Sequence, residues 1–361
     1  MKIVSIVGAR PQFVKVAAIT HTFSSSIEEV IIHTGQHYDS TLSEVFFREL
    51  NIPAPRYNLG VGSGSHAYQI GTMVMALEDI LKKEKPLLVL VYGDTNSAIG
   101  GALAAAKLQI PIGHVEAGLR NFDLAIMEEQ NRLVCDHLST LLFAPTETAV
   151  KNLKREGLEN RLYFTGDVMY DILLSSLPKA RSHSTLAHRL ELQSRKYLLA
   201  TVHRPENTEN PDHLRNIVNA LIASEERIVF PMHPRTQKRL QELNILKSIP
   251  DRISILEPLG YWDFLAMLSD ARIIITDSGG IQKEAYCLRT PCITLFDTTS
   301  WVETVEDGWN TLSSASYDEI LTKIRTFNPP ATQKHTYGDG TAGKKIASIV
   351  LDFLNRLPSA H

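Results

Sequence analysis

The side chains best suited to proton transfer are three carboxylates in the first half of the chain. Asp94 ends the string Tyr-Gly-Asp, Glu116 ends His-Val-Glu, and Glu128 lies in Met-Glu-Glu. Carboxylates gathered at one site can remove a proton from carbon and return it. The sequence therefore predicts acid–base chemistry if the fold brings these three groups to one rim.

Each of these carboxylates also has a structural explanation. Asp94 could cap the helix that follows it, and Glu116 could form an ion pair with Arg120. Glu128 could be favoured only by the dipole of a helix that begins near it. Taken singly, the structural explanation is the stronger one, and only the presence of all three on one rim favours catalysis.

Two further groups of residues favour binding of a phosphorylated ligand. Arg10 and Lys15 follow the first apolar segment, where the start of a helix attracts anions. The string Asp-Ser-Gly-Gly at 277–280 follows another apolar segment, and its glycines allow backbone N–H groups to approach a diphosphate closely. Glu284, one turn into the next helix, could accept hydrogen bonds from ribose hydroxyls. The alternatives are solvated surface charges and an ordinary capped turn.

A histidine-arginine pair lies in the second half of the chain. His203 and Arg204 stand in Val-His-Arg-Pro-Glu-Asn, and His233 follows the next apolar segment in a weaker form of the same pattern. Such a pair can meet a sugar or a phosphate, although a lone histidine is more often structural. The glycine-rich dinucleotide fingerprint is absent after the first segment, which argues against NAD.

Short apolar segments separated by helical stretches recur along the chain. They are residues 3–7, 29–33, 87–92, 112–115, 141–144, 162–165, 197–202, 228–232, 253–256, 273–276 and 292–296. Such segments are typical of parallel strands covered by helices on both faces. They are too many for one doubly wound sheet, so we predict an α/β protein with two Rossmann-like domains. Their parallel sheets should face a cleft in which ligands bind.

The predicted boundary lies just after Gly-Asp at 166–167. Residues 1–167 would form a first domain with the carboxylates, and residues 168–341 a second, nucleotide-binding domain. A final helix within 342–361 would pack back on the first domain.

The composition excludes some classes of function. The 361 residues carry a net charge of −3, which offers no general surface for nucleic acid, and no basic run suggests a membrane surface. The apolar N-terminal stretch is too short for a signal peptide. The three cysteines lack metal-ligand spacing, so we expect buried thiols, no metal and a cytoplasmic location.

In their order along the chain, these motifs resemble the non-hydrolysing UDP-N-acetylglucosamine 2-epimerase family, which has the GT-B fold. The resemblance covers nearly the whole chain and includes residues 8–15, 33–37, 92–96, 114–120 and 277–284. It implies inversion at C2 of a UDP-linked acetamido sugar, without a nicotinamide or metal cofactor. It also implies a homodimer.

The same resemblance implies roles for individual residues. The catalytic cleft would contain Arg10, Lys15, Asp94, Glu116, Glu128 and His203. Ser278, Gly279 and Gly280 would hold the diphosphate of UDP, and Glu284 the ribose. Gln36 and His37 fall where some members bind a second, regulatory UDP-sugar.

The substrate and the outcome of the reaction stay open. The strings Gly-Ala-Arg-Pro-Gln, His-Thr-Gly-Gln-His and Trp-Val-Glu resemble a branch that acts on 2,3-diacetamido-2,3-dideoxy-glucuronate sugars. The usual Met-Pro-Glu-Glu reads Met-Glu-Glu at 127–129, and residues 296–300 lack an arginine and a glutamate typical of the family. A hydrolysing epimerase, a GT-B glycosyltransferase and an inactive UDP-sugar sensor are the alternatives.

Overall fold

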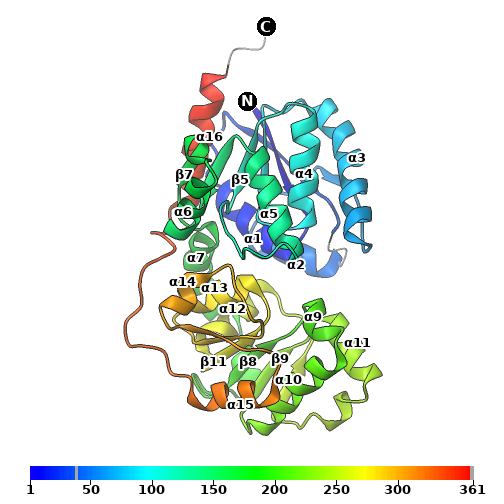
Figure 1. Ribbon diagram of the computed structural model, residues 1–361, viewed down its shortest axis with the longest axis vertical. Helices are drawn as coiled ribbons and strands as arrows, with labels where there is room; N and C mark the ends of the chain where they lie inside the picture. Colours follow the sequence, from blue (N-terminus) through cyan, green and yellow to red (C-terminus); the bar gives the residue numbers. More distant parts are fainter. Residues whose placement is uncertain (37–39, 358–361) are drawn as a thin grey trace. The chain divides into compact units, whose positions relative to one another are not determined.

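The computed structural model describes residues 1–36 and 40–357, without the side chains of residues 40–44. Its contacts divide the chain into two compact units (Figure 1). The first unit combines Met1–Ser175 with the segment from Thr336 onward, and the second is Ser176–His335. The division falls inside helix α7 (Val168–His183), beyond the boundary predicted after residue 167.

The first unit is built on a seven-stranded sheet in which every pair of neighbouring strands is parallel. In spatial order the strands are β3 (Tyr57–Asn58), β2 (Glu28–His33), β1 (Lys2–Val7), β4 (Leu88–Tyr92), β5 (Ile112–Val115), β6 (Leu141–Ala144) and β7 (Leu162–Phe164). The central strands β1 and β4 are buried almost throughout, because helices cover both faces of the sheet.

The helices of this unit connect successive strands. They are α1 (Arg10–Thr20), α2 (Ser40–Glu49), α3 (His66–Glu84), α4 (Asn96–Lys107), α5 (Met127–Leu138), α6 (Glu147–Arg155), α7 and α16 (Ala342–Arg356). Helices α3, α4 and α5 lie side by side over one face of the sheet (Figure 1). Thr146 is the N-cap of α6, and its hydroxyl accepts the backbone N–H of Ala149.

Helix α16 belongs to the first unit because it packs on α1. The backbone N–H of Gly343 donates to the Asp171 carboxylate at 2.8 Å, and its carbonyl accepts from the Thr22 hydroxyl. A side chain at Gly343 would place its Cβ 2.1 Å from the Ala18 carbonyl oxygen. The close approach of the two helices therefore requires glycine at this position.

The second unit repeats the architecture with a six-stranded parallel sheet. Its spatial order is β10 (Ile253–Leu256), β9 (Ile228–Pro231), β8 (Leu198–Thr201), β11 (Ile273–Thr276), β12 (Cys292–Thr294) and β13 (Asn310–Leu312). Its helices are α8 (Leu186–Arg189), α9 (Pro205–Thr208), α10 (Pro211–Ala223), α11 (Pro234–Glu242), α12 (Tyr261–Asp270), α13 (Gly279–Cys287), α14 (Val302–Glu306) and α15 (Tyr317–Thr326).

Each sheet reverses its strand order once, and this reversal positions the candidate site. In the first unit the chain winds outward in both directions from β1 and β4, and in the second from β8 and β11. Loops that leave such a pair diverge to opposite faces and open a crevice at the carboxyl ends of the strands. The segments after β1, β4, β8 and β11 are the ones that carry Arg10, Asp94, His203 and Ser278.

Two strands and one cysteine differ from expectation. The edge strands β3 and β13 were not predicted, because one has two residues and the other contains a buried asparagine. Cys135 and Cys292 are buried as expected, whereas Cys287 is partly exposed. Within the described residues, no helix combines the length and the apolar character needed to cross a membrane.

Candidate functional site

A buried ion pair joins two of the predicted site residues in the first unit. Lys15 on α1 lies with its Nζ 2.5 Å from Oε1 of Glu116, and each side chain is 5% exposed. Glu116 follows β5 and has a φ of +74°, a left-handed conformation that is uncommon for any residue with a side chain. Strain of this kind persists where the surroundings hold it and is common at functional sites. The alternative pairing of Glu116 with Arg120 is therefore wrong.

Gly93 leaves room for this pair. Its φ is +62°, and a Cβ added there would lie 2.8 Å from Nζ of Lys15 and 3.3 Å from Oε1 of Glu116. The backbone N–H of Gly93 donates to the Val115 carbonyl at 2.9 Å. The loop that precedes Asp94 thus lies directly against the Lys15–Glu116 pair.

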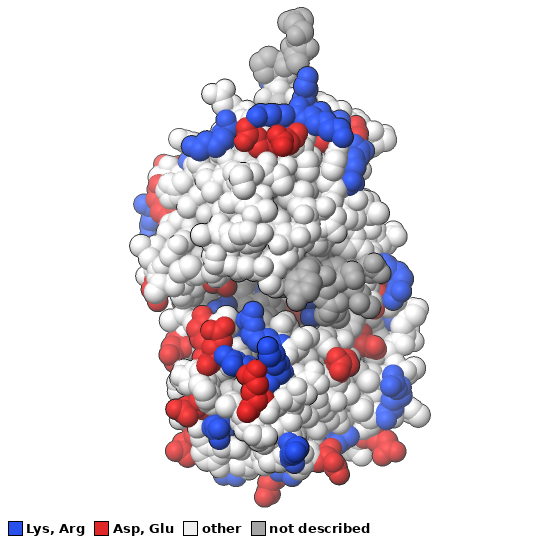
Figure 2. Space-filling view, turned by 90° about the vertical axis from the view of Figure 1, so that its right-hand side faces the viewer, with Lys and Arg blue, Asp and Glu red and all other residues white. Residues whose placement is uncertain are grey.

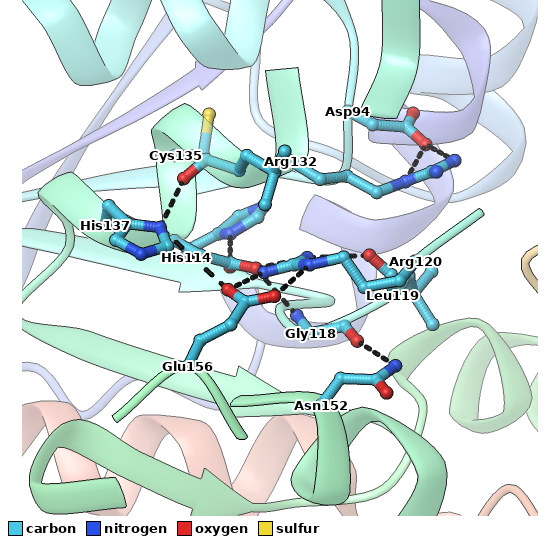
Figure 3. A network of polar contacts seen from close by, with 12 residues as sticks. Asp94, His114, Gly118, Leu119, Arg120, Arg132, Cys135, His137, Asn152 and Glu156 are labelled. Carbon is cyan, nitrogen blue, oxygen red and sulfur yellow. Dashed lines mark hydrogen bonds and ion pairs between the residues drawn. The ribbon is translucent and has the colours of Figure 1, made fainter. Parts of the chain in front are cut away.

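Asp94 is held by an arginine that sequence analysis did not select. Oδ2 of Asp94 accepts from Nε and Nη2 of Arg132 at 3.0 and 2.7 Å (Figure 3). Asn131 donates to the Asp94 backbone carbonyl. Helix α4 begins beyond Asp94, with Thr95 at its N-cap, so the interpretation of Asp94 as a helix cap is wrong. Burial alone would lower the pKa of Arg132, but Asp94 and Glu129 outweigh burial and raise it. Arg132 therefore holds Asp94 as a carboxylate.

The two glutamates at the start of α5 have different environments. Glu129 is buried, and its carboxylate accepts the backbone N–H groups of Asn121 and Phe122 as well as Nη1 of Arg132. Glu128, in the same first turn, is only partly buried. Glu129 therefore shapes the loop before the helix, and Glu128 is the carboxylate placed where a ligand can reach it.

The predicted anion site at the start of α1 is partly occupied by the protein itself. Oε1 of Gln12 accepts the backbone N–H groups of Gly8 and Ala9 at 2.8 and 3.1 Å. The guanidinium of Arg10 lies over the ring of Phe46, 4.8 Å from its centre. Two donors at this helix start are thus satisfied internally, and Arg10 is held beside an aromatic ring.

Gln36 lies at the end of β2, on the same edge of the sheet. Its Oε1 accepts from the backbone N–H and the hydroxyl of Ser97 at 3.0 and 2.7 Å, so its carbonyl is used within the protein. His37, the other residue of the predicted regulatory site, lies outside the described residues.

A polar network that is buried except at Glu156 contacts the loops after β4 and β5, and sequence analysis missed it (Figure 3). His114 on β5 contacts Asp136 on α5 and the Gly93 carbonyl. Arg120 pairs with Asp136 and with Glu156. His114 lies within one of the family motifs, and this position on a buried strand was the only signal in the sequence.

In the second unit an aspartate positions the predicted histidine. Nδ1 of His203 lies 3.0 Å from Oδ1 of Asp277, whose carboxylate also accepts the backbone N–H groups of His203 and Arg204. Burial would raise the pKa of Asp277, but His203 and these N–H groups lower it to about 2. The carboxylate is therefore ionised, and the partly exposed His203 ring is oriented by its Nδ1 contact.

The predicted diphosphate loop is the start of α13. Ser278 is the N-cap, Gly279 and Gly280 form the first turn, and all three are partly exposed. The N–H groups of this turn point out of the helix start, as an anion site requires. A Cβ added to Gly279 would lie 3.6 Å from the indole nitrogen of Trp301, so an aromatic side chain borders the loop.

Three more predicted residues, Arg204, His233 and Glu284, lie in the second unit. Glu284 is buried on α13, and it acts with burial to raise the pKa of Tyr261 well above its usual value. The guanidinium of Arg204 lies 5.0 Å from the ring centre of Phe296. The ring of His233 lies 6.1 Å from that of His203, so these two predicted residues are neighbours.

The described residues give no sign of a metal centre. Within residues 1–36 and 40–357, no three His, Cys, Asp or Glu side chains gather as they would around a metal ion.

Two doubly wound parallel sheets, each with polar side chains at its point of reversal, define a GT-B-type α/β protein. A solved structure of Methanocaldococcus jannaschii UDP-GlcNAc 2-epimerase in complex with UDP-GlcNAc and UDP has this fold. It matches the chain with a TM-score of 0.93 and 42% identity, covering 98% of this chain and 100% of that one. The chain belongs to the UDP-N-acetylglucosamine 2-epimerase family, whose model matches residues 21–351.

Relatives within the family differ in the substrate that their names state. A Methanococcus maripaludis protein, named as a homolog of UDP-N-acetylglucosamine 2-epimerase, is 51% identical and covers 97% of this chain and 99% of its own length. The UDP-2,3-diacetamido-2,3-dideoxy-D-glucuronate 2-epimerase of Pseudomonas aeruginosa is 42% identical over the same shares of the two chains. Both similarities extend over nearly all of each protein.

Proposed function

We propose that the protein interconverts UDP-GlcNAc and UDP-ManNAc as a non-hydrolysing UDP-N-acetylglucosamine 2-epimerase. The observation that carries the proposal is the pair of loops after β4 and β5, which we call the carboxylate rim. In these loops Asp94 is paired with Arg132 and Glu116 with Lys15. Family membership over residues 21–351 supports it. Arg204, His233 and Glu284 are proposed as further ligand contacts.

The first step of the proposed reaction breaks two bonds. C2 carries no adjacent carbonyl, so its proton is weakly acidic. Departure of UDP with the electron pair of the C1–O bond gives C1 oxocarbenium character, which acidifies the C2 proton. A carboxylate then takes that proton, leaving 2-acetamidoglucal and UDP. Asp94, held ionised by Arg132, is suited to accept a proton.

The second step reverses the first on the other face of the ring. An oxygen of the UDP diphosphate adds to C1, and C2 receives a proton from the side opposite to the one that lost it. Glu116 and Glu128 are the remaining candidates for this proton transfer. Substrate and product have the same oxidation state, so the reaction needs no electron acceptor.

UDP must be stabilised while it carries its full negative charge. The N–H groups of Gly279 and Gly280 at the start of α13 are proposed to do this together with the Ser278 hydroxyl, because preorganised donors are most effective where charge develops. The backbone N–H of Ser278 donates to the Thr276 hydroxyl. His203 is proposed to add a donor, since Asp277 orients its ring through Nδ1. Arg10 and Lys15 would add positive charge.

A second candidate substrate follows from the relatives. The Pseudomonas aeruginosa relative carries a different sugar in its name at 42% identity, and the Methanocaldococcus jannaschii UDP-N-acetylglucosamine 2-epimerase also matches at 42%. Sequence identity to these two relatives therefore does not favour one substrate over the other. UDP-2,3-diacetamido-2,3-dideoxy-glucuronate is the alternative that must be tested beside UDP-GlcNAc.

We further propose that the protein is a homodimer in the cytoplasm. Helix α3 carries no Lys, Arg, Asp or Glu in residues 66–77, and Tyr68 and Met75 are 58% and 67% exposed on it. Figure 2 shows a broad area without charged side chains on the face that α3 covers. An apolar, uncharged helix face suits contact with a second copy of the chain.

The test is incubation of the purified protein with UDP-GlcNAc in D₂O, followed by NMR. We expect deuterium at C2 together with UDP-ManNAc. Free UDP with ManNAc would instead indicate a hydrolysing enzyme, and transfer to an added acceptor a glycosyltransferase. No change with either UDP-GlcNAc or the diacetamido uronate, despite binding, would indicate a sensor and refute the proposal.

A further inference from the structure

The buried histidine of β5 faces two hydrogen-bond acceptors. Nε2 of His114 lies 2.8 Å from the Gly93 carbonyl oxygen, and Nδ1 lies 2.6 Å from Oδ1 of Asp136. The side chain is completely buried. A carbonyl oxygen only accepts hydrogen bonds, so Nε2 must carry a proton.

The contacts of Asp136 extend this connection to a second loop. Oδ2 of Asp136 accepts from the backbone N–H of Gly118 at 3.0 Å and pairs with Nη1 of Arg120 at 2.7 Å. Burial would raise the pKa of Asp136, but His114 and Arg120 more than offset this and lower it. The ring of His114 therefore links the Gly93 carbonyl to a carboxylate that holds the N–H of Gly118.

Arg120 and Glu156 extend the network toward the surface. Arg120 donates from Nε and Nη2 to both oxygens of Glu156, each at 2.7 Å. The thiol of Cys135 is neutral because burial raises its pKa well above the usual value. On the exposed side, Nδ1 of His137 lies 3.9 Å from Glu156. Arg120 thus lies between two carboxylates that compensate its charge.

His114 and Asp136 together connect the two loops of the carboxylate rim. His114 holds the carbonyl of Gly93, the residue before Asp94, and Asp136 holds the N–H of Gly118, two residues after Glu116. Both glycines have positive φ, +62° and +86°, so neither loop has a regular conformation of its own. The buried connection through His114 and Asp136 therefore acts together with the backbone hydrogen bond from Gly93 to the Val115 carbonyl to fix the separation of the two loops.

We propose that His114, hydrogen-bonded to Asp136 and to the Gly93 carbonyl, is a positioning residue that holds the Gly93–Asp94 loop in register with the Glu116–Gly118 loop. The proposal rests on the proposed function for its effect on turnover, but its structural content can be measured without any substrate. A change in this register would displace Asp94 from the reacting carbon, and misplacement by about 1 Å costs on the order of 10²-fold in rate.

Two substitutions separate the two contacts of the ring. The amide of glutamine reaches the place of Nε2, so His114→Gln keeps a donor for the Gly93 carbonyl. The amide of asparagine reaches only the place of Nδ1, so His114→Asn keeps the Asp136 contact and loses Gly93. We expect kcat to fall roughly 10²-fold in H114N and about 10-fold or less in H114Q, with KM within about threefold of wild type in both.

A double-mutant cycle tests whether His114 acts through Asp94. In an Asp94→Asn background, H114N should cause little further loss of kcat, because the group that it positions is already disabled. A purely structural defect would instead multiply the two losses. Additive losses, or equal kcat in H114N and H114Q, would overturn the proposal even if the wild-type protein is an active epimerase.

Two measurements do not depend on activity. In ¹⁵N-histidine-labelled wild type, Nε2 of His114 should resonate as a protonated nitrogen, because the Gly93 carbonyl can only accept a hydrogen bond, and an unprotonated Nε2 would refute this contact. Amide hydrogen exchange in residues 92–96 should accelerate in H114N and not in H114Q, and equal exchange would refute the positioning role. Inactive wild type with both expected results would refute only the proposed function.

Discussion

Replacing Lys15 by methionine tests the energetics of the carboxylate rim most directly. At the 2.5 Å separation of Nζ and Oε1, two unit charges attract by about 7 kcal/mol with an effective dielectric constant of about 20. Most of this offsets the cost of burying both ions, so the pair as a whole contributes little. Removing one partner leaves Glu116 charged and buried, which costs about 3–5 kcal/mol. K15M should lower the free energy of unfolding by that amount.

A surface pair of equal length is the matched control. Lys82 and Glu78 on α3 are also 2.5 Å apart, but their side chains are 56% and 47% exposed. Lys82→Met should therefore cost less than about 1 kcal/mol. The double variant K15M/E116Q should recover much of the stability lost in K15M, because no buried charge is left unpaired, and it should remain inactive.

The assay has to report on the first unit. Trp262, Trp301 and Trp309 all lie in the second unit, so tryptophan fluorescence follows the unfolding of that unit. Hydrogen exchange of the backbone amides in β1 and β4, measured in increasing urea, reports on the sheet beneath Lys15. If K15M is as stable as K82M to within about 1 kcal/mol, or if E116Q does not rescue K15M, the reasoning about this pair is wrong.

Three further changes have defined outcomes. Asp277→Asn should lower the free energy of unfolding by roughly 2–3 kcal/mol at pH 7, because the Asp277 pKa of about 2 in the folded protein lies below its value in the unfolded chain. This stabilisation is present above the unfolded pKa and is lost as the pH falls, so the difference from wild type should vanish toward pH 2. Unfolding followed by tryptophan fluorescence measures it. Gly343→Ala should detach α16 and lower the melting temperature, since its Cβ would overlap the Ala18 carbonyl. Glu303→Gln should raise the melting temperature, because both Glu303 carboxylate oxygens are buried without a hydrogen-bond partner among the described residues.

Each of these three has a result that contradicts it. A constant difference between D277N and wild type from pH 7 to pH 2 would mean that His203 does not stabilise the ionised aspartate. Lys344 is exposed on α16, so K344A is the control for G343A, and equal melting temperatures would contradict the docking argument. A lower melting temperature in E303Q would mean that its charge is compensated.

The sheets were predictable because buried parallel strands consist of consecutive apolar residues. Each predicted segment contains a strand, and the errors lie at the edges, where β3 is too short for any periodicity to appear. The helix start at Thr146 was predictable for the same local reason, because its hydroxyl bonds three residues ahead. These strands and this helix start could be predicted because residues close together in the sequence determine them.

The partners of the site residues were not predictable, because they come from distant parts of the chain. Lys15 and Glu116 are brought together by the pairing of β1, β4 and β5, and no local pattern links them. The expectation that Glu116 pairs with the nearby Arg120 failed for this reason, since Arg120 turns to Asp136 and Glu156. Residue type identified the candidates, and only the fold shows which charge compensates which.

The docking of α16 on α1 has a consequence for synthesis on the ribosome. One half of the contact emerges first, at Ala18 and Thr22, and the other half emerges last, at Gly343. The second unit, Ser176–His335, is contiguous and can complete its sheet before α16 has been translated. The apolar side of α1 therefore stays exposed until α16 has been translated. During this interval the nascent chain most needs protection from aggregation.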